Sequence, residues 1–100
     1  MKRISVRIKE NKRMSNKELV KIFKALGNER RFLILKHLFA KKELTVGQIS
    51  EFINLSFKSV SRHLSVLSNV DLVKVRQVSI NRFYSINDSG FPKQLFQLFK

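Results

Sequence analysis

Hydrophobic residues recur at helical spacing in the first part of the chain. Leu19, Ile22, Phe23 and Leu26 lie three and four positions apart, which predicts an amphipathic helix. We expect Asn16 to cap this helix at its start, and Gly27 and Asn28 to mark its end. A second helix is expected over residues 29–39. Its apolar stripe is the wider of the two, which predicts that it lies at the centre of the core.

The next segment predicts two shorter helices joined by a tight turn at Asn54 and Leu55. Thr45 and Gln48 form a capping-box pattern at the start of the first helix, and Ser56 can cap the second, which runs to about residue 69. The residues expected to point inward from this second helix share the helical spacing: Phe57, Val60, Leu64 and Leu67. Its other side is polar and basic, and its small serines would let it enter the major groove of DNA. These features are typical of a helix-turn-helix.

The pattern changes to strands after residue 71. Residues 72–76 and 82–86 are β-type runs, and residues 77–81 between them are predicted to form a hairpin tip with Arg76 and Arg82 on its flanks. Pro92 can occupy the first turn of a last, very apolar helix. The predicted fold is therefore mainly α with a small β-hairpin, in the order helix, helix, helix-turn-helix, hairpin, C-terminal helix. This order describes a winged helix-turn-helix.

The charge of the chain points to a polyanionic partner. Lys and Arg number 21 against 7 Asp and Glu, which gives a net charge of +14. This balance indicates nucleic acid or an anionic membrane surface. We expect a basic arm over residues 1–15 and a single domain over residues 16–100. The arm residues Lys2, Arg3 and Arg7 would lie along DNA phosphates; the alternatives are a solvated terminus or a short strand packed on the domain.

The composition excludes several classes of protein. Because the chain has no Cys, it has no disulfide, thiol nucleophile or cysteine zinc site. Its acidic residues are scattered, and neither a Ser/His/Asp arrangement nor a glycine-rich phosphate loop is present, so we expect no enzyme and no cofactor. No apolar run approaches the roughly 20 residues of a membrane span, and no signal peptide pattern follows the basic start. We therefore expect a cytoplasmic protein with no membrane partner.

Three segments of the chain resemble the ArsR (SmtB-like) family of winged helix-turn-helix regulators. They are KALGNERRFLILKHL at 24–38, ELTVGQISEFINLSFKSVSRHLSVL at 43–67 and LVKVRQVSINRFYSI at 72–86, and SVSRHLSVL is the most specific part. The resemblance implies that the second helix of the motif reads the major groove of DNA. It also implies that the hairpin is the wing and that the first and last helices form a homodimer.

The chain departs from the family's metal sensors. Thr45 and Gly47 stand where those proteins have a Cys-x-Cys pair, and the C-terminal segment GFPKQLFQLFK has neither His nor an acidic residue. The two histidines lie far apart in the sequence and in other elements, so we expect no metal site. Asp71 stands where Gly is usual before the first wing strand, and Phe57 where a polar residue is common.

The candidate site residues fall into three groups, each with a simpler structural alternative. The recognition-helix group could be an ordinary solvated face, with His63 half-buried: Ser56, Lys58, Ser59, Ser61, Arg62 and His63. The wing group is expected to contact the DNA backbone: Arg76, Gln77, Ser79 and Arg82. The dimer group comes from the first and last helices, and its C-terminal members could instead complete the core of a monomer: Leu19, Ile22, Phe23, Leu95, Phe96 and Phe99.

The favoured hypothesis is a sequence-specific, homodimeric transcriptional repressor. It would bind a palindromic operator in double-stranded DNA through helix 56–69 and wing 72–86. The alternative is a non-specific architectural or RNA-associated binder, which the concentration of charge in residues 1–42 supports. A protein-interaction module is a third hypothesis, and a role at a membrane surface ranks last because the arm lacks an amphipathic helical pattern. The sequence does not identify an effector: a small apolar molecule at the dimer seam, a partner protein and control by abundance all stay open.

Overall fold

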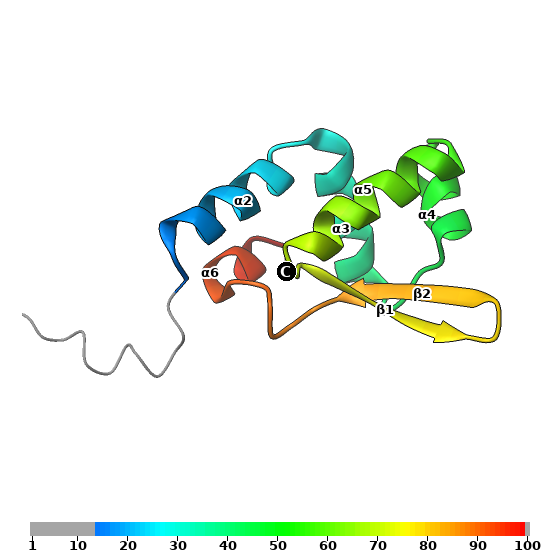
Figure 1. The fold of residues 1–100 in the computed structure, drawn as a ribbon. Coiled ribbons are helices and arrows are strands. Elements are labelled where there is room, and N and C mark those ends of the chain that lie inside the picture. The colour runs from blue at the N-terminus through cyan, green and yellow to red at the C-terminus, as the bar shows by residue number, and fades with distance from the viewer. Residues whose placement is uncertain (1–13, 100) are drawn as a thin grey trace, which may run out of the picture.

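The computed structural model describes residues 14–99, so the arm residues Lys2, Arg3 and Arg7 lie outside the described part (Figure 1). Its elements follow one another as α2 (Asn16–Leu26), α3 (Glu29–Ala40), α4 (Val46–Ile53), α5 (Phe57–Asn69), β1 (Val73–Val78), β2 (Asn81–Ile86), α6 (Lys93–Phe96) and the 3₁₀ helix η2 (Gln97–Phe99). The predicted order of elements and the winged helix-turn-helix fold are confirmed. None of the described helices is long and apolar enough to cross a membrane.

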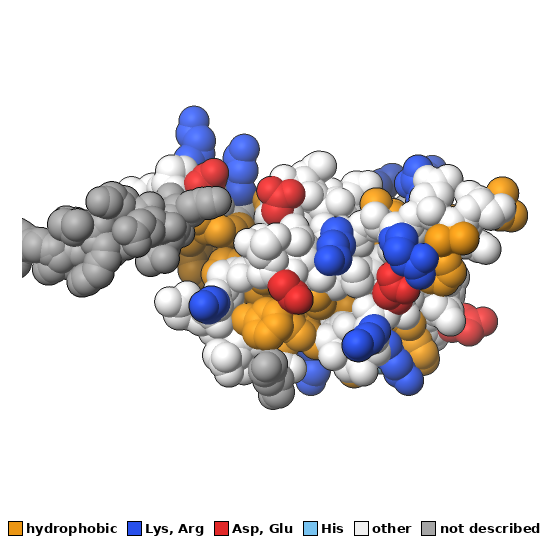
Figure 2. All heavy atoms as spheres, turned by 90° about the horizontal axis from the view of Figure 1, so that it is seen from below, with side chains coloured by type: hydrophobic (Ala, Val, Ile, Leu, Met, Phe, Trp, Pro, Cys, Tyr) orange, Lys and Arg blue, Asp and Glu red, His pale blue; other side chains and the backbone are white. Residues whose placement is uncertain are grey.

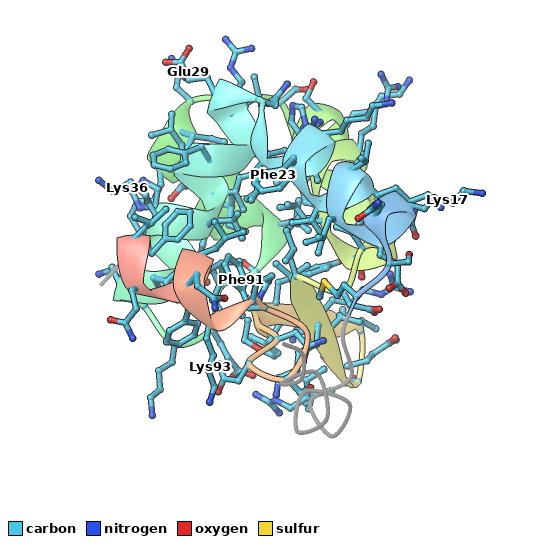
Figure 3. The ribbon with its side chains drawn as sticks, turned by 90° about the vertical axis from the view of Figure 1, so that its left-hand side faces the viewer. Lys17, Phe23, Glu29, Lys36, Phe91 and Lys93 are labelled. Carbon is cyan, nitrogen blue, oxygen red and sulfur yellow. The ribbon has the colours of Figure 1, made fainter. Side chains whose placement is uncertain are left out.

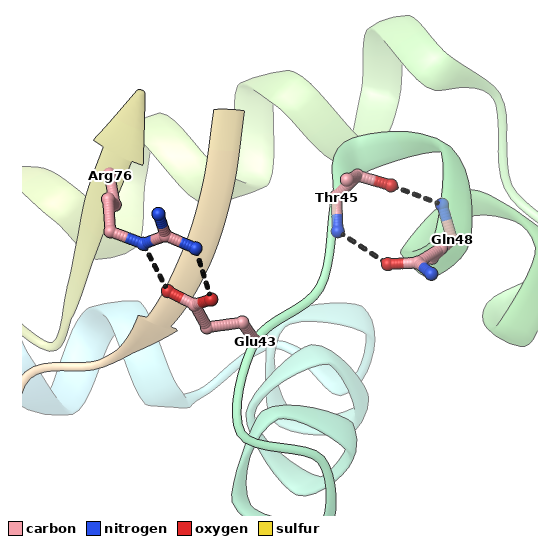
Figure 4. Close-up of polar contacts among 4 residues, drawn as sticks. All are labelled: Glu43, Thr45, Gln48 and Arg76. Atoms are coloured by element: carbon pink, nitrogen blue, oxygen red, sulfur yellow. Dashed lines mark hydrogen bonds and ion pairs between the residues drawn. The ribbon is translucent and has the colours of Figure 1, made fainter. Parts of the chain in front are cut away.

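Side-chain caps decide where the helices begin. The hydroxyl of Thr45 accepts from the backbone N–H of Gln48, and the Gln48 side chain accepts from that of Thr45, so the predicted capping box is present (Figure 4). The predicted cap at Asn16 was wrong. Ser15 has the extended backbone that a cap requires and forms its own capping box with Glu18. Asn16 is the first residue of α2.

The core lies between α3 and the elements around it. Ile34, Leu35 and Leu38 of α3 are buried, as the wide apolar stripe of this helix predicted. They belong to one cluster whose other buried members are Ile22, Ala25, Leu44, Val46, Ile49, Val60, Leu64, Leu67, Leu72, Val73, Ile86 and Phe91. This cluster includes residues of every element except α6 and η2, so it fixes the orientation of the helix-turn-helix relative to the hairpin.

The hairpin is tighter than its sequence suggested. β1 and β2 pair antiparallel from Val73 opposite Ile86 to Val78 opposite Asn81. The connection is therefore the two residues Ser79 and Ile80, not the predicted five-residue tip. Two-residue hairpin turns need positive φ, and Ser79 supplies it at 59°. The strands run on to the turn because backbone pairing satisfies the N–H and C=O groups that a longer loop would leave to water.

Two backbone features shape the base of the hairpin: a left-handed residue at Asp71 and the close approach of Gly90 to it. Asp71 has φ 60°, in the left-handed region that glycine adopts most easily, which accounts for the glycine usual at this position in the resembling family. At Gly90, a Cβ atom would lie 2.1 Å from the Asp71 carbonyl oxygen, so only glycine permits this approach. The Asn87 side-chain amide also donates to that carbonyl at 3.1 Å.

The C-terminal segment packs through aromatic rings. Phe39 of α3 stacks on Phe99 at 4.9 Å between centroids, and it meets Phe91 and Phe96 edge-on at 5.3 and 5.0 Å. The last helix is shorter than predicted, with four residues in α6 and a turn of 3₁₀ helix after it. α2 and α6 both lie at the end of the molecule opposite the hairpin tip (Figures 1 and 3).

Candidate nucleic-acid interface

α5 is held firmly by its inner face. Val60, Leu64 and Leu67 are fully buried at 0% exposure, and they lie on one side of the helix. At about 100° per residue, Lys58 and Arg62 project from the opposite side. Both are exposed. The core therefore sets the direction in which these two cations point, as the sequence predicted.

The outer face of α5 is positive and has no compensating acid. The helix contains no Asp or Glu. Within residues 14–99, the structure records no ion pair for Lys58 or Arg62, since its one salt bridge joins Arg76 to Glu43. Two cations without acidic partners on a rigid helix form a surface that attracts an anion such as a nucleic-acid phosphate.

The serines of α5 divide into two roles. Ser56 caps the helix, because its hydroxyl accepts from the backbone N–H of Ser59 at 3.1 Å. Ser59 and Ser61 are half-buried, whereas Ser65 is exposed one turn beyond Ser61. The small side chains leave the helix narrow on this side, which suits entry into a groove.

His63 lies on the flank of α5 that faces α3. Its Nδ1 is 3.3 Å from the Nη1 of Arg31, and the same guanidinium donates to the carbonyls of Ala25 at 2.6 Å and Lys24 at 3.3 Å. Arg31 thus ties together the end of α2, the start of α3 and the middle of α5. The imidazole is engaged inside the domain, so His63 does not belong to the outward-facing set of Lys58 and Arg62.

The surroundings of His63 favour its neutral form. Partial burial lowers its pKa below 6.5, and the nearby positive charges of Arg31, Arg30 and Arg62 lower the pKa further. A neutral imidazole can accept a hydrogen bond from Arg31, whereas the protonated ring cannot. The contact between Arg31 and His63 was not predicted from the sequence, because the two residues lie 32 positions apart along the chain.

The orientation of Phe57 differs from the prediction. It was expected to point inward with Val60, but its side chain is 61% exposed. The three-residue spacing places it about 60° around the helix from Val60, and it stands at the first residue of α5, beyond the part that the core covers. Phe57 therefore lies on the surface between α5 and the hairpin.

One of the two predicted wing arginines forms an ion pair within the chain. Arg76 donates two hydrogen bonds to the carboxylate of Glu43, at 3.0 and 2.8 Å (Figure 4). Its guanidinium also lies 5.0 Å from the centre of the Phe83 ring. This pairing lowers the pKa of Glu43 and raises the pKa of Arg76. Glu43 lies in the segment between α3 and α4, and no local sequence signal predicted its contact with the hairpin.

The other wing residues lie at the exposed end of the hairpin. Arg82 is exposed, and the described residues offer it no ion pair. Gln77 donates through its side-chain amide to the carbonyl of Ser79 at 3.3 Å, which braces the turn. Arg82 is thus the wing cation whose charge is available to a partner.

A row of lysines on α2 was missed by the sequence analysis. Lys17, Lys21 and Lys24 are exposed and spaced by four and three residues, so they share one face of the helix. In Figure 3, Lys17 points away from the domain. Lys21 and Lys24 also line a shallow groove between α2 and α5, together with Arg31 and Asn69. The four- and three-residue spacing of these lysines is the sequence signal that could have located them.

The residues predicted for the dimer seam do not form one exposed set. Ile22 is only 3% exposed and fills the core of the single chain. Phe23 is 57% exposed at the end of the molecule seen in Figure 3, and Leu98 of η2 is 75% exposed. The other predicted members are half-buried: Leu19, Leu95, Phe96 and Phe99. α2 and η2 therefore offer apolar surface around Phe23 and Leu98.

The outer face of α5 differs in charge from the rest of the described surface. Among residues 14–99, no three His, Asp or Glu side chains gather where they could hold a metal ion. Charges of both signs mix with apolar patches on the underside of the molecule (Figure 2). The acid-free surface of α5 contrasts with this mixture.

Comparison with known proteins agrees with the architecture. The model of the bacterial regulatory protein arsR family matches residues 28–75. The transcriptional activator HlyU of Vibrio cholerae is 34% identical over 89 residues, which are 89% of this chain and 81% of HlyU. A solved structure of that protein superimposes with a TM-score of 0.71 at 31% identity, over 86% of this chain and 90% of the other.

Two further solved structures are similar. A homodimeric winged helix-turn-helix DNA-binding domain from Mycobacterium bovis has a TM-score of 0.70 at 26% identity and covers 86% of this chain and 81% of its own. The transcriptional repressor PagR of Bacillus anthracis has the same TM-score and identity, over 84% of this chain and 94% of its own. The chain therefore belongs to the ArsR family of bacterial regulatory proteins, and it is a transcriptional regulator with a winged helix-turn-helix.

Proposed function

We propose that this regulator is a homodimeric repressor that binds a palindromic operator in double-stranded DNA. The observation that carries the proposal is the outer face of α5, where Lys58 and Arg62 project without acidic partners from a helix fixed by the core. Residues at the start of such a helix approach base edges, and its arginines are suited to guanine. The hairpin adds Arg82 for the backbone. Because it acts on the genome, the protein would work in the cytoplasm.

Dimerisation would follow from the apolar surface on α2 and η2. Phe23 of α2 and Leu98 of η2 are too exposed to serve the core of one chain, and α2 lies away from the hairpin tip (Figure 1). A two-fold axis at this end would present two copies of α5 to successive major grooves about 34 Å apart. The similar domain from M. bovis is a homodimer, which supports the proposal that this chain also forms dimers.

Repression is the direction that we propose for the regulation. The similar PagR is a transcriptional repressor, whereas HlyU is a transcriptional activator. Activation would require a further surface that contacts RNA polymerase. A dimer bound across a promoter excludes polymerase without such a surface, so repression requires less of this small domain.

The test is selection of bound duplexes from a random DNA pool at about 150 mM salt, with the mass of the complex measured in parallel. The proposal expects an inverted repeat whose half-sites are about 10 base pairs apart from centre to centre, bound by two chains. A reporter gene behind the selected sequence should be expressed less when the protein is present. Enrichment of a single half-site bound by one chain would contradict the dimer.

A non-specific architectural binder is the second candidate, and the lysine row on α2 favours it. Lys17, Lys21 and Lys24 can neutralise phosphates of any sequence. This candidate predicts that the same selection enriches no sequence and that binding weakens steeply as salt rises. Selection therefore separates the two candidates in one experiment.

A further inference from the structure

Phe57 is an exposed aromatic side chain at the start of α5. It is the first residue of the helix and is 61% exposed. It belongs neither to the buried core nor to the half-buried residues packed against that core. The folding of the single chain therefore gives no reason for a phenylalanine at this position.

The surroundings of Phe57 match the chemistry of duplex DNA. It lines a groove between the start of α4, the start of α5 and the hairpin tip, with Thr45, Gly47, Ser61, Ile80 and Arg82 among the other lining residues. None of the residues that line this groove is acidic, and Lys58 follows Phe57 directly on α5. An apolar ring framed by hydroxyls and cations favours a partner that combines phosphates with a small apolar group.

We infer that Phe57 contacts the C5-methyl group of a thymine in each operator half-site, and so determines part of the operator sequence. This inference rests on the proposed function. Thymine alone among the four bases presents a methyl group in the major groove, and phenylalanine is one of the side chains that contacts it. The first residues of the helix in the groove are those that reach base edges.

Ile80 provides a matched control within the same groove. Its side chain is 89% exposed, and it also lines the groove. However, it sits on the two-residue turn of the hairpin and not on α5, where the wing would meet sugar and phosphate. Removing Ile80 takes away a comparable amount of exposed apolar surface without touching the proposed base contact.

The experiment replaces thymine by uracil, which lacks only the methyl group. Duplexes carrying the sequence selected by the wild-type protein are synthesised with dT→dU at each thymine in turn, in both half-sites together. Burial of one methyl group predicts about a fourfold weaker Kd for each half-site, and about fifteenfold for two, at the contacted thymine. F57A and F57Q should bind the dT and dU duplexes equally, whereas I80A should discriminate as the wild type does. The helical signal in far-ultraviolet circular dichroism checks that each variant is folded.

The outcomes separate the inference from the function on which it rests. If the wild type selects an inverted repeat but binds every dU duplex as tightly as the parent, the inference is overturned and the proposed function stands. Equal discrimination by F57A and the wild type also overturns it. If selection enriches no sequence, the proposed function itself fails, and the inference fails with it.

Discussion

The outer face of α5 and the hairpin both present arginines, but they hold them differently. Arg62 has no ion-pair partner within residues 14–99, whereas Arg76 donates two hydrogen bonds to Glu43 and lies over Phe83. Arg62 can meet a phosphate or a base without giving up a contact. Arg76 must first leave its carboxylate. The number of arginines in a region therefore overstates the charge that the region offers to a partner.

The two regions also differ in how firmly they are fixed. The inner face of α5 is fully buried at Val60, Leu64 and Leu67, whereas only the first residue of β1 is buried. The hairpin is held near its base, where Leu44 forms two backbone hydrogen bonds with Tyr84. A helix that reads base edges must be held rigidly. A pair of strands that contacts only the DNA backbone can adjust its position and still bind.

Truncating the buried side of α5 should have the largest effect. Leu64→Ala is expected to lower the free energy of unfolding by about 2–5 kcal/mol, because it opens a cavity in the core. Val78→Ala in the hairpin should change it by less than about 0.5 kcal/mol, because that side chain is exposed. Urea unfolding measures both. Similar losses for the two variants would contradict the difference in anchorage.

Removing the free arginine of α5 should come next in size. Arg62→Ala is expected to weaken binding to the selected operator by about 1–3 kcal/mol for each protomer, while leaving the free energy of unfolding unchanged. Titration of a labelled operator and of a scrambled duplex measures the change. An equal loss on both duplexes would show that Arg62 contacts phosphates and does not read a base.

Freeing Arg76 of the hairpin from its ion pair should have a smaller effect on DNA binding, and it should strengthen binding where Arg62→Ala weakens it. Glu43→Gln removes the carboxylate that holds Arg76, and the free energy of unfolding should change little because the pair is exposed to solvent. If the freed Arg76 meets a phosphate, the slope of log K against log salt should steepen by about 0.9 for each protomer. An E43Q/R76A double variant is the control and should lack this change. An unchanged slope in E43Q would mean that Arg76 does not reach the backbone.

The smallest expected effect concerns the inner flank of α5. The pKa of His63 is lowered in the folded protein, so the unfolded chain takes up its proton first as pH falls. Stability should therefore decline from about pH 6.5 down through the lowered pKa of the folded state. His63→Gln should reduce this decline, as urea unfolding at pH 7.5 and 5.0 would measure. An identical decline in the variant would assign it to other groups.

The sequence predicted what depends on neighbouring residues. Helical spacing located α2 to α5, and the pair Thr45 and Gln48 located the start of α4, because a cap acts over three residues. Similar local chemistry misled at α2, where Ser15 and Asn16 are both good capping residues. The spacing of Ser15 and Glu18 matches a capping box, and this was the signal that could have selected Ser15.

Contacts between distant residues could not be predicted in this way. Arg31 meets His63, and Glu43 meets Arg76, across 32 and 33 positions of the chain. Neither pair follows a spacing rule, because both depend on how α3 packs against α5 and the hairpin. The exposure of Phe57 has the same origin: its spacing fits the inner face, and the neighbouring elements leave it uncovered.

Methylation interference on the selected operator tests the central claim most directly, namely that two copies of α5 read the major groove. Methyl groups at guanine N7 lie in that groove, where they block a helix without disturbing the backbone. The account predicts interference in two clusters about 10 base pairs apart, with the minor groove between them insensitive to methylation at adenine N3. Interference at no guanine, or equally at guanines throughout the duplex, would contradict it.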